Sequence, residues 1–222
     1  MNRIIAFTVM ICALMLAGCA APVPYDYTEL KKSKPKSILV LPPINESPDI
    51  NAGPSMLTQI TQPLSEAGYY VLPVAVVDET FKQNGLTEST DIHALSTAKL
   101  QQIFGADAVM YVKVVEYGTS YMVISSDTRV TATATLVDLR SGALLWSGKA
   151  SASSSEDNNH NNSNNLIAML ITAAVKQISS TIRDEGHTIA GITSNRMLSA
   201  GHFNGILYGP RSPLYGKDDL KS

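Results

Sequence analysis

The clearest chemistry in this sequence belongs to Cys19, whose thiol follows two small residues, Ala17 and Gly18. A thiol in this setting can accept a lipid group, and the small residues before it let a peptidase reach the bond between Gly18 and Cys19. We therefore expect signal cleavage after Gly18 and a covalent diacylglycerol and N-acyl chain on Cys19. No other cofactor is expected.

The element that must position this cysteine is the apolar N-terminus. Arg3 gives a short positive start, and residues 4–16 are almost wholly hydrophobic, which is the layout of an export signal. The run is shorter than the ~20 apolar residues that span a bilayer. With Leu16 before it, the Cys19 motif resembles the lipobox of bacterial lipoproteins; a plain secretory peptide or a buried helix is the alternative. Ala20 favours the outer membrane, because an Asp there would signal retention in the inner membrane.

Charge and cysteine content narrow the class of protein further. The 222 residues carry a net charge of −2, which becomes −3 when Arg3 leaves with the signal, and this argues against a nucleic-acid binder. Because Cys12 lies in the signal and Cys19 carries the lipid, no thiol remains for a disulfide. Packing alone must then stabilise the exported domain. A chain of this length predicts one domain with a tail.

Residues 19–36 are expected to form a lipidated tether between the membrane and the domain, since they show no apolar period. The basic residues of this segment are Lys31, Lys32, Lys34 and Lys36. They either contact anionic lipid or keep the tether solvated. Solvation is favoured, because attraction to a membrane surface is only about 1 kcal/mol per charge and is screened by salt.

Metal and catalytic sites are not expected. The four histidines, none of which lies in a His-x-x-x-His or Glu-x-x-His frame, are His93, His160, His187 and His202. No Gly-x-Ser-x-Gly motif offers a nucleophile, and adjacent acids such as Asp78 and Glu79 point apart on a helix. The sequence therefore predicts neither a bound metal nor an enzyme.

The first part of the predicted domain, which spans residues 37–200, mixes strands and helices. The apolar run that begins at Ser37 ends in Pro42 and Pro43, which is typical of a buried strand. A second short strand is predicted over residues 69–74. Helices are predicted from apolar spacing and terminal glycines over residues 53–67, 76–84 and 91–104.

After Gly105 the apolar pattern changes to period two and predicts an antiparallel meander. Its strands are expected over residues 108–117, 121–138 and 143–153, with turns at residues 118–119 and 140–142. The face expected to point to the core carries Val130, Ala132, Ala134, Leu136, Leu144, Trp146, Gly148 and Ala150. A helix over residues 165–185 should cover this face, after a Ser- and Asn-rich mobile loop. Thr131, Thr133 and Thr135 share the opposite face.

The last segment, residues 201–222, is rich in Gly, Tyr and Pro and cannot form a core of its own. Its candidate partner-binding residues are Leu207, Tyr208, Leu214 and Tyr215, because aromatic anchors are enriched at interfaces. Docking of the same residues on the chain's own domain is the favoured alternative. The threonine face offers another surface, and an edge strand there could pair with a second copy to form a homodimer.

Several motifs together carry a family resemblance. They are KSILVLPPIN at residues 36–45, EAGYYVLPV at 66–74, DETF at 78–81, IFGADA at 103–108 and YMVISSDT at 121–128. From the lipobox to about residue 200, the chain resembles a family of Gram-negative lipoproteins typified by a meningococcal antigen studied as a vaccine candidate. The resemblance implies a mixed α/β domain similar to the N-terminal domain of TolB and, more remotely, to the curli secretion lipoprotein CsgG. It implies no catalytic residues, and it implies a partner, because such genes often lie beside that of a CsgG-like lipoprotein.

Two functions of different classes follow from these observations. The favoured one is an outer-membrane lipoprotein whose periplasmic domain serves as an assembly or scaffold subunit of a cell-envelope complex with a CsgG-like lipoprotein. The alternative is a periplasmic module that binds a small molecule or peptide between the loop at residues 42–51 and the helices. The predicted fold class is the same in both: a mixed α/β domain, with an antiparallel meander packed by helices, after a lipoprotein signal peptide.

Overall fold

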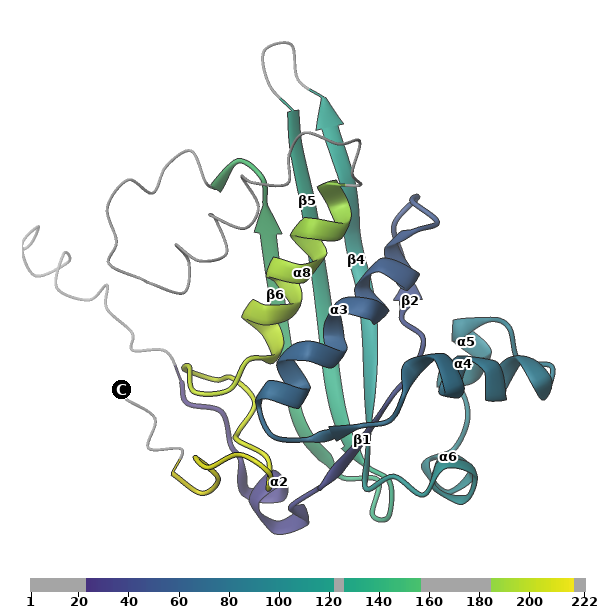
Figure 1. The fold of residues 1–222 in the computed structure, drawn as a ribbon, viewed down its shortest axis with the longest axis vertical. Helices are drawn as coiled ribbons and strands as arrows, with labels where there is room; N and C mark the ends of the chain where they lie inside the picture. Colours follow the sequence, from purple (N-terminus) through teal and green to yellow (C-terminus); the bar gives the residue numbers. More distant parts are fainter. Residues whose placement is uncertain (1–22, 122–125, 157–184, 218–222) are drawn as a thin grey trace, which may run out of the picture.

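The computed structural model describes residues 23–121, 126–156 and 185–217, so the predicted signal peptide, Gly18 and Cys19 lie outside the described residues. Helices pack against one sheet with three long strands (Figure 1). The helices are α2 (Thr28–Ser33), α3 (Ala52–Glu66), α4 (Val74–Gln83), α5 (Ser89–His93), α6 (Thr97–Phe104) and α8 (Glu185–Leu198). The strands are β1 (Ser37–Val40), β2 (Ile44–Asn45), β3 (Tyr70–Val71), β4 (Ala108–Tyr121), β5 (Ser126–Asp138) and β6 (Leu144–Ser153). None of these helices is long and apolar enough to cross a membrane.

The sheet is mixed, which confirms the predicted fold class. Its strand order is β3-β1-β4-β5-β6, and β2 also pairs with β4. The short strands pair in parallel, β1 with both β3 and β4, whereas β4, β5 and β6 form the antiparallel meander. Pro42 and Pro43 separate β1 from β2, because proline has no N–H to donate to the neighbouring strand. The predicted strand that ends at these prolines is therefore confirmed.

The first turn of the meander does not lie where the sequence predicted it. Gly118 and Thr119 are inside β4, paired with Arg129 and Thr128, and β4 continues to Tyr121. Gly118 has a φ of 139°, a backbone conformation that glycine adopts readily, so it continues the strand after a bulge near Val115 instead of reversing it. The second turn, at residues 140–142, is confirmed.

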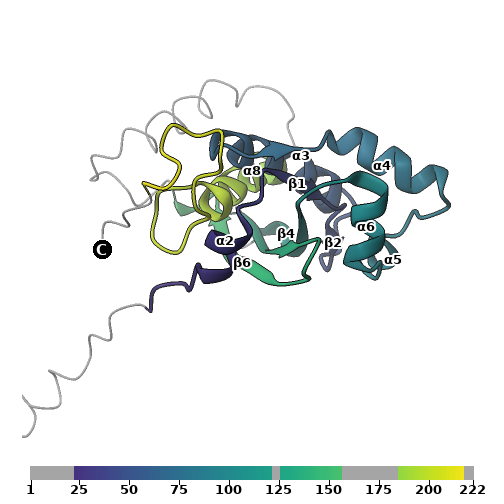
Figure 2. The ribbon, with the colours of Figure 1, turned by 90° about the horizontal axis from the view of Figure 1, so that it is seen from below.

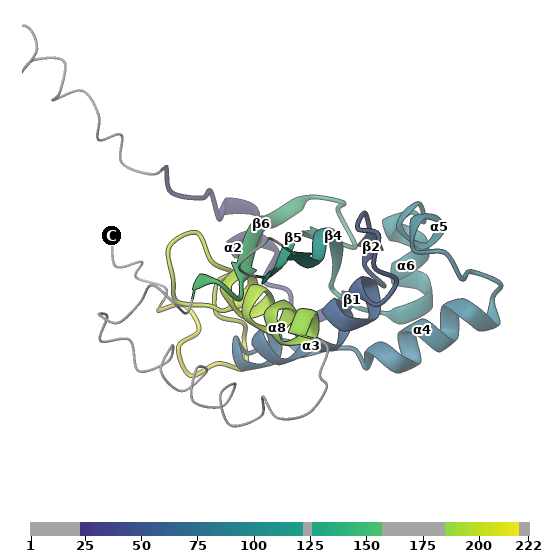
Figure 3. The ribbon, with the colours of Figure 1, turned by 90° about the horizontal axis from the view of Figure 1, so that it is seen from above.

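One face of the meander, which we call the inner face, packs on α3 and α8 (Figures 1 and 3). Its buried side chains include Val130, Ala132, Ala134, Leu136, Trp146 and Ala152. The prediction was wrong for Leu144, which is 51% exposed. A bulge pairs Leu136 with Trp146 but Val137 with Leu144, so the residue between, Leu145, is buried in its place.

A second, smaller core lies on the other side of β1. Helices α4, α5 and α6 bury Val77, Phe81, Ile92 and Leu100 there, together with Leu39 and Leu41. The helix predicted over residues 91–104 is divided into α5 and α6. Ser96 is the N-cap of α6, where its hydroxyl accepts the Lys99 N–H at 3.3 Å.

The segment predicted as a tether is part of the folded domain from Tyr25 onward. It forms α2, and Tyr27 and Leu30 are 5% and 3% exposed in the main core. The Tyr27 hydroxyl donates to the carbonyl of Gly205 at 2.6 Å. Two apolar residues are too few to show a helical period in the sequence. The helix is ordered because both side chains are buried against the C-terminal segment.

The helix predicted to cover the inner face, over residues 165–185, falls almost wholly outside the described residues, as does most of the Ser- and Asn-rich loop before it. Among the described residues, α8 covers the inner face together with α3, and this helix was not predicted from the sequence. Its buried stripe is Ile189, Ala190, Thr193, Ser194, Met197 and Leu198. Gly186 lets it approach closely, since an added Cβ there would lie 2.6 Å from the Tyr117 ring.

Candidate functional site

The first candidate site is a pocket between α2 and the C-terminal segment, residues 201–217, which we call the α2 pocket. Its volume is about 420 Å³. Helix α2 and the residue after it contribute Leu30, Lys31 and Lys34, and the C-terminal segment contributes Leu207, Tyr208 and Tyr215. Three of the four residues predicted to bind a partner therefore meet at one place. The fourth, Leu214, is 44% exposed beside them.

Backbone contacts fix the C-terminal segment against the end of α3. The Gly209 N–H donates to the Ala67 carbonyl at 2.8 Å, and the Arg211 N–H donates to the Gly68 carbonyl at 3.0 Å. Only glycine fits at position 209, because an added Cβ would lie 2.6 Å from the Gly68 oxygen. The Tyr69 hydroxyl donates to the Leu207 carbonyl at 2.8 Å.

The tail was predicted either to dock on its own domain or to bind a partner, and for Leu207 these contacts decide between the two. Leu207 is 7% exposed and belongs to the main core, so it docks on its own domain and is not available to a partner. Tyr215 is 42% exposed at the pocket, and Leu214 is similarly open. Partner binding by these two residues stays a prediction.

The second candidate site is the outer face of the meander, which we call the open sheet face. It is defined by the outward residues of β4, β5 and β6: Lys113, Glu116, Arg129, Thr131, Thr133, Thr135, Leu144, Ser147, Lys149 and Ser151. Figures 2 and 3 show α4, α5 and α6 gathered near β1 and β2 rather than over this surface. An antiparallel sheet tolerates such exposure because polar side chains alternate with the buried ones.

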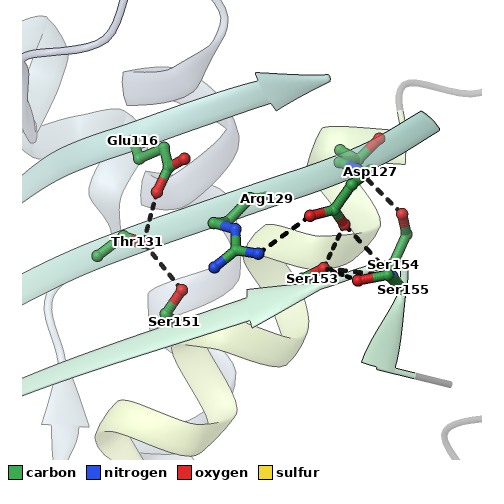
Figure 4. A network of polar contacts seen from close by, with 9 residues as sticks. Glu116, Asp127, Arg129, Thr131, Ser151, Ser153, Ser154 and Ser155 are labelled. Atoms are coloured by element: carbon green, nitrogen blue, oxygen red, sulfur yellow. Dashed lines mark hydrogen bonds and ion pairs between the residues drawn. The ribbon is translucent and has the colours of Figure 1, made fainter. Parts of the chain in front are cut away.

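Polar side chains are linked across the open sheet face near the ends of its strands (Figure 4). The Thr131 hydroxyl lies 3.2 Å from a Glu116 oxygen and 2.9 Å from the Ser151 hydroxyl. On the next outward row, Arg129 pairs with Asp127 at 3.0 Å, and the Ser153 hydroxyl also donates to Asp127. The Ser153 hydroxyl and the Arg129 guanidinium hold the pKa of Asp127 below its ordinary value. This gives the surface a fixed pattern of donors and acceptors.

A serine–histidine pair that sequence reasoning missed joins α3 to α8. The Ser55 hydroxyl lies 2.7 Å from Nδ1 of His187, and the Tyr117 hydroxyl donates to Ser55 at 3.1 Å. The other ring nitrogen of His187 is 2.7 Å from the amide of Gln59, where a catalytic triad would place a carboxylate. Since Ser55 is only 7% exposed, we interpret the cluster as a polar contact between two packed helices. No spacing in the sequence could reveal it, because the pair is 132 residues apart.

The other described histidines are held by backbone groups. His93 donates from Nε2 to the Pro42 carbonyl at 2.9 Å, and burial lowers its pKa. His202 lies beside the Phe203 carbonyl, and His160 is outside the described residues. Within residues 23–121, 126–156 and 185–217, no three His, Cys, Asp or Glu side chains gather as a metal site would require.

A family model described as "Putative lipoprotein GNA1162-like" matches residues 25–211. The chain belongs to this family. The match begins at Tyr25 and ends at Arg211, so α2 and the first half of the C-terminal segment are part of the GNA1162-like unit rather than additions to it. The family resemblance carried by the sequence motifs is confirmed, and with it the class of the protein as a lipoprotein.

Relatives agree with this assignment. The chain is 50% identical over 201 residues to the lipoprotein NMB1124/NMB1162 of Neisseria meningitidis serogroup B (strain ATCC BAA-335 / MC58), covering 89% of this chain and 92% of that protein. The crystal structure of lipoprotein GNA1162 from Neisseria meningitidis is 57% identical with a TM-score of 0.54, covering 66% of this chain and 100% of that one. The C-terminal domain of LpoB from Salmonella enterica is 19% identical with a TM-score of 0.38, covering 53% and 82%, and we draw no functional argument from it.

Proposed function

We propose that this protein is a non-enzymatic assembly or scaffold subunit of a cell-envelope complex, anchored in the outer membrane by lipid on Cys19. Its domain faces the periplasm, and its partner is a CsgG-like lipoprotein. Membership of a lipoprotein family supports the anchor, as do the lipobox and the Ala that follows it. The TolB-like character of the domain belongs to the same proposal.

The observation that carries the proposal is the open sheet face. Within the described residues, no helix packs over the side chains that define this face of the three long strands, and Leu144 and Lys149 are exposed on it. The linked side chains around Thr131 and Asp127 hold hydrogen-bonding groups in place before a partner arrives. Preorganised polar groups around a few apolar residues are what specific interfaces use, because less conformational entropy is lost on binding.

A pull-down from gently solubilised outer membranes tests this proposal. The bait carries its tag within residues 157–165, which follow β6 and include none of the residues that define the open sheet face. One variant combines Thr135→Glu with Lys149→Glu, and its matched control combines Thr87→Glu with Lys99→Glu on the α4–α6 side. The proposal expects a CsgG-like lipoprotein to come down with the wild type and the control but at least tenfold less with the Thr135/Lys149 variant. Recovery of every bait alone would contradict it.

A homodimer is a second form of the same scaffold. The free edge of β6 is available for pairing only in part, because the Arg196 guanidinium already binds the Ser151 carbonyl at 2.9 Å. Light scattering of the unlipidated protein distinguishes the two: a single monomeric species would remove the homodimer and leave the hetero-complex.

The alternative function, a periplasmic ligand-binding module, gains one observation. A pocket exists, although it lies at α2 rather than at the loop over residues 42–51 as predicted. Thermal unfolding with envelope extracts fractionated by size tests it, because a ligand that binds the folded state must raise the midpoint. A rise with a small-molecule fraction, together with failure of the pull-down, would favour this alternative.

A further inference from the structure

The α2 pocket combines positive charge with an apolar lining. Lys31 and Lys34 line it beside Leu30, Leu207 and Tyr215, and none of the described lining residues is acidic. Its volume of about 420 Å³ lies within the range of small-ligand sites, which is about 300–1,000 Å³. A group that fits such a site carries negative charge on an apolar body.

The N-terminus of the domain is fixed to the C-terminal segment, which also lines this pocket. The side chain of Asn204 accepts the Tyr25 N–H at 2.8 Å and donates to the Val23 carbonyl at 3.2 Å. Figures 2 and 3 show the N-terminal segment and the C-terminal segment on the same side of the domain, beside α2. Four Cα–Cα steps separate Val23 from Cys19, and these span at most about 14 Å. Lipid on Cys19 would therefore hold the α2 pocket close to the membrane surface.

The rim of the pocket has the composition of a membrane-facing surface. Leu214 and Tyr215 are 44% and 42% exposed, and Phe203 is 40% exposed on the same segment. Aromatic side chains settle at the membrane–water interface, and lysines next to it attract anionic headgroups. Lys31 lies in the folded helix α2 and Lys34 is its C-cap, so the backbone holds both lysines beside the pocket.

We propose that the α2 pocket binds the phosphate headgroup of an anionic phospholipid from the bilayer that holds the anchor. Lys31 and Lys34 contact the phosphate, while Leu30 and Tyr215 contact the glycerol and the first methylenes. This inference rests on the proposed anchor at Cys19, and it deepens the proposed function by giving the domain a defined orientation at the membrane.

Vesicle co-sedimentation tests the proposal with the mature chain, residues 19–222, in which Cys19→Ser prevents acylation. The vesicles contain neutral phospholipid alone or neutral phospholipid with phosphatidylglycerol. We expect binding only to the anionic vesicles, and a decrease as salt rises. A combined Lys31→Gln and Lys34→Gln variant, which keeps most of each apolar stem, should bind about 30-fold more weakly. The matched control, Lys99→Gln with Lys149→Gln, removes the same charge elsewhere and should bind like the wild type.

A second measurement locates the site and its source of phosphate. Short-chain phosphatidylglycerol below its micelle concentration should shift the NMR signals of Leu30, Tyr208 and Tyr215, whereas glycerol phosphate should not displace the protein from vesicles. Equal losses in the two lysine variants, or signal shifts confined to other residues, would overturn the proposal. Binding of glycerol phosphate without vesicle binding would overturn the lipid as its source. Because no partner protein is present, failure here is distinguishable from failure of the pull-down.

Discussion

The two faces of the meander come from the same strands but are built for different neighbours. Along β5, Ala132 and Ala134 point inward and are at most 2% exposed, while Thr133 and Thr135, which alternate with them, point outward. The alanines leave room for α8, and the Thr193 hydroxyl of α8 reaches the Val130 carbonyl at 3.1 Å. The threonines keep the β-branched shape that strands favour without creating an apolar patch. One alternating segment therefore specifies both a close contact with a helix and a polar, solvent-exposed surface.

Truncation of a large inner side chain should have the largest effect. Leu136 is fully buried, so Leu136→Ala should lower the free energy of unfolding by about 2–5 kcal/mol through lost contacts and a cavity. Its neighbour Thr135 points outward, and Thr135→Ala should stay within about 0.5 kcal/mol. Urea unfolding of both variants measures the difference. Similar losses in the two would contradict the contrast between the faces.

Adding volume to the inner face should cost somewhat less. A Cβ on Gly148 would lie 2.4 Å from the Trp146 ring, so Gly148→Ala must displace the indole and weaken its bond to the Asn204 carbonyl. We expect a loss of about 1–3 kcal/mol. Ser147→Ala on the open sheet face is the control and should change stability little. Thermal unfolding followed by tryptophan fluorescence reports both stability and the ring's environment.

Removal of a single hydroxyl should also lower stability by different amounts on the two faces. Thr193 is fully buried and donates to Val130, so Thr193→Val should cost about 0.5–1.5 kcal/mol because a buried hydrogen bond is lost. Thr131 is itself 8% exposed, but Thr131→Val on the other face should cost less, because its partners Glu116 and Ser151 are more exposed and can bind water instead. Chemical denaturation of the two single variants and the double variant tests this order, and a larger loss for Thr131→Val would reverse it.

The smallest expected effect is on the pH dependence of stability and involves Asp138, at the end of β5. Burial alone would raise the pKa of Asp138, but donors from Ser33, Ser141 and the Arg140 N–H outweigh it and hold the pKa below its ordinary value. This stabilisation is present above the unfolded pKa of about 3.9 and is lost as pH falls through the lower folded value. Ser33→Ala removes one donor and raises the folded pKa, so the variant should be less stable than the wild type near pH 7, and the difference should narrow as the pH falls below about 3.9. Urea midpoints measured between pH 7 and pH 2.5 check the shift, and identical profiles would mean that Ser33 does not stabilise the carboxylate.

Local patterns predicted the features of the fold that depend on alternation and end signals. The Val130–Leu136 alternation predicted which face is buried, and Pro42 and Pro43 marked the end of β1. Two strand features failed because bulges are not visible in period-two patterns: Gly118 continues β4, and Leu145 replaces Leu144 in the core. Helix α8 was missed because small and polar residues, Thr193 and Ser194 among them, make up part of its buried stripe.

The candidate sites were predictable to different extents. The open sheet face followed from alternation alone, so its threonines were named correctly. The large side chains of the tail were also recognised, but their grouping with Lys31 and Lys34 depends on contacts across more than 170 residues. Helix α2 has too few residues for a period, and its order comes from the C-terminal segment that packs on it. Long-range contact of this kind is not encoded in any local pattern.

The contacts of Asn204 and Gly205 with residues 23–27 also bear on the order of events when the protein is made. In a chain that crosses a membrane N-terminus first, Tyr25 and Tyr27 emerge long before the partners they bind near residue 204. The segment next to Cys19 therefore remains unpacked until almost the whole chain has been translocated. On the proposed route, no folded domain crowds Cys19 during that interval, so the enzymes that would attach the lipid and cleave the signal have open access to it. The final closure of the domain at Asn204 would then follow lipid attachment in time.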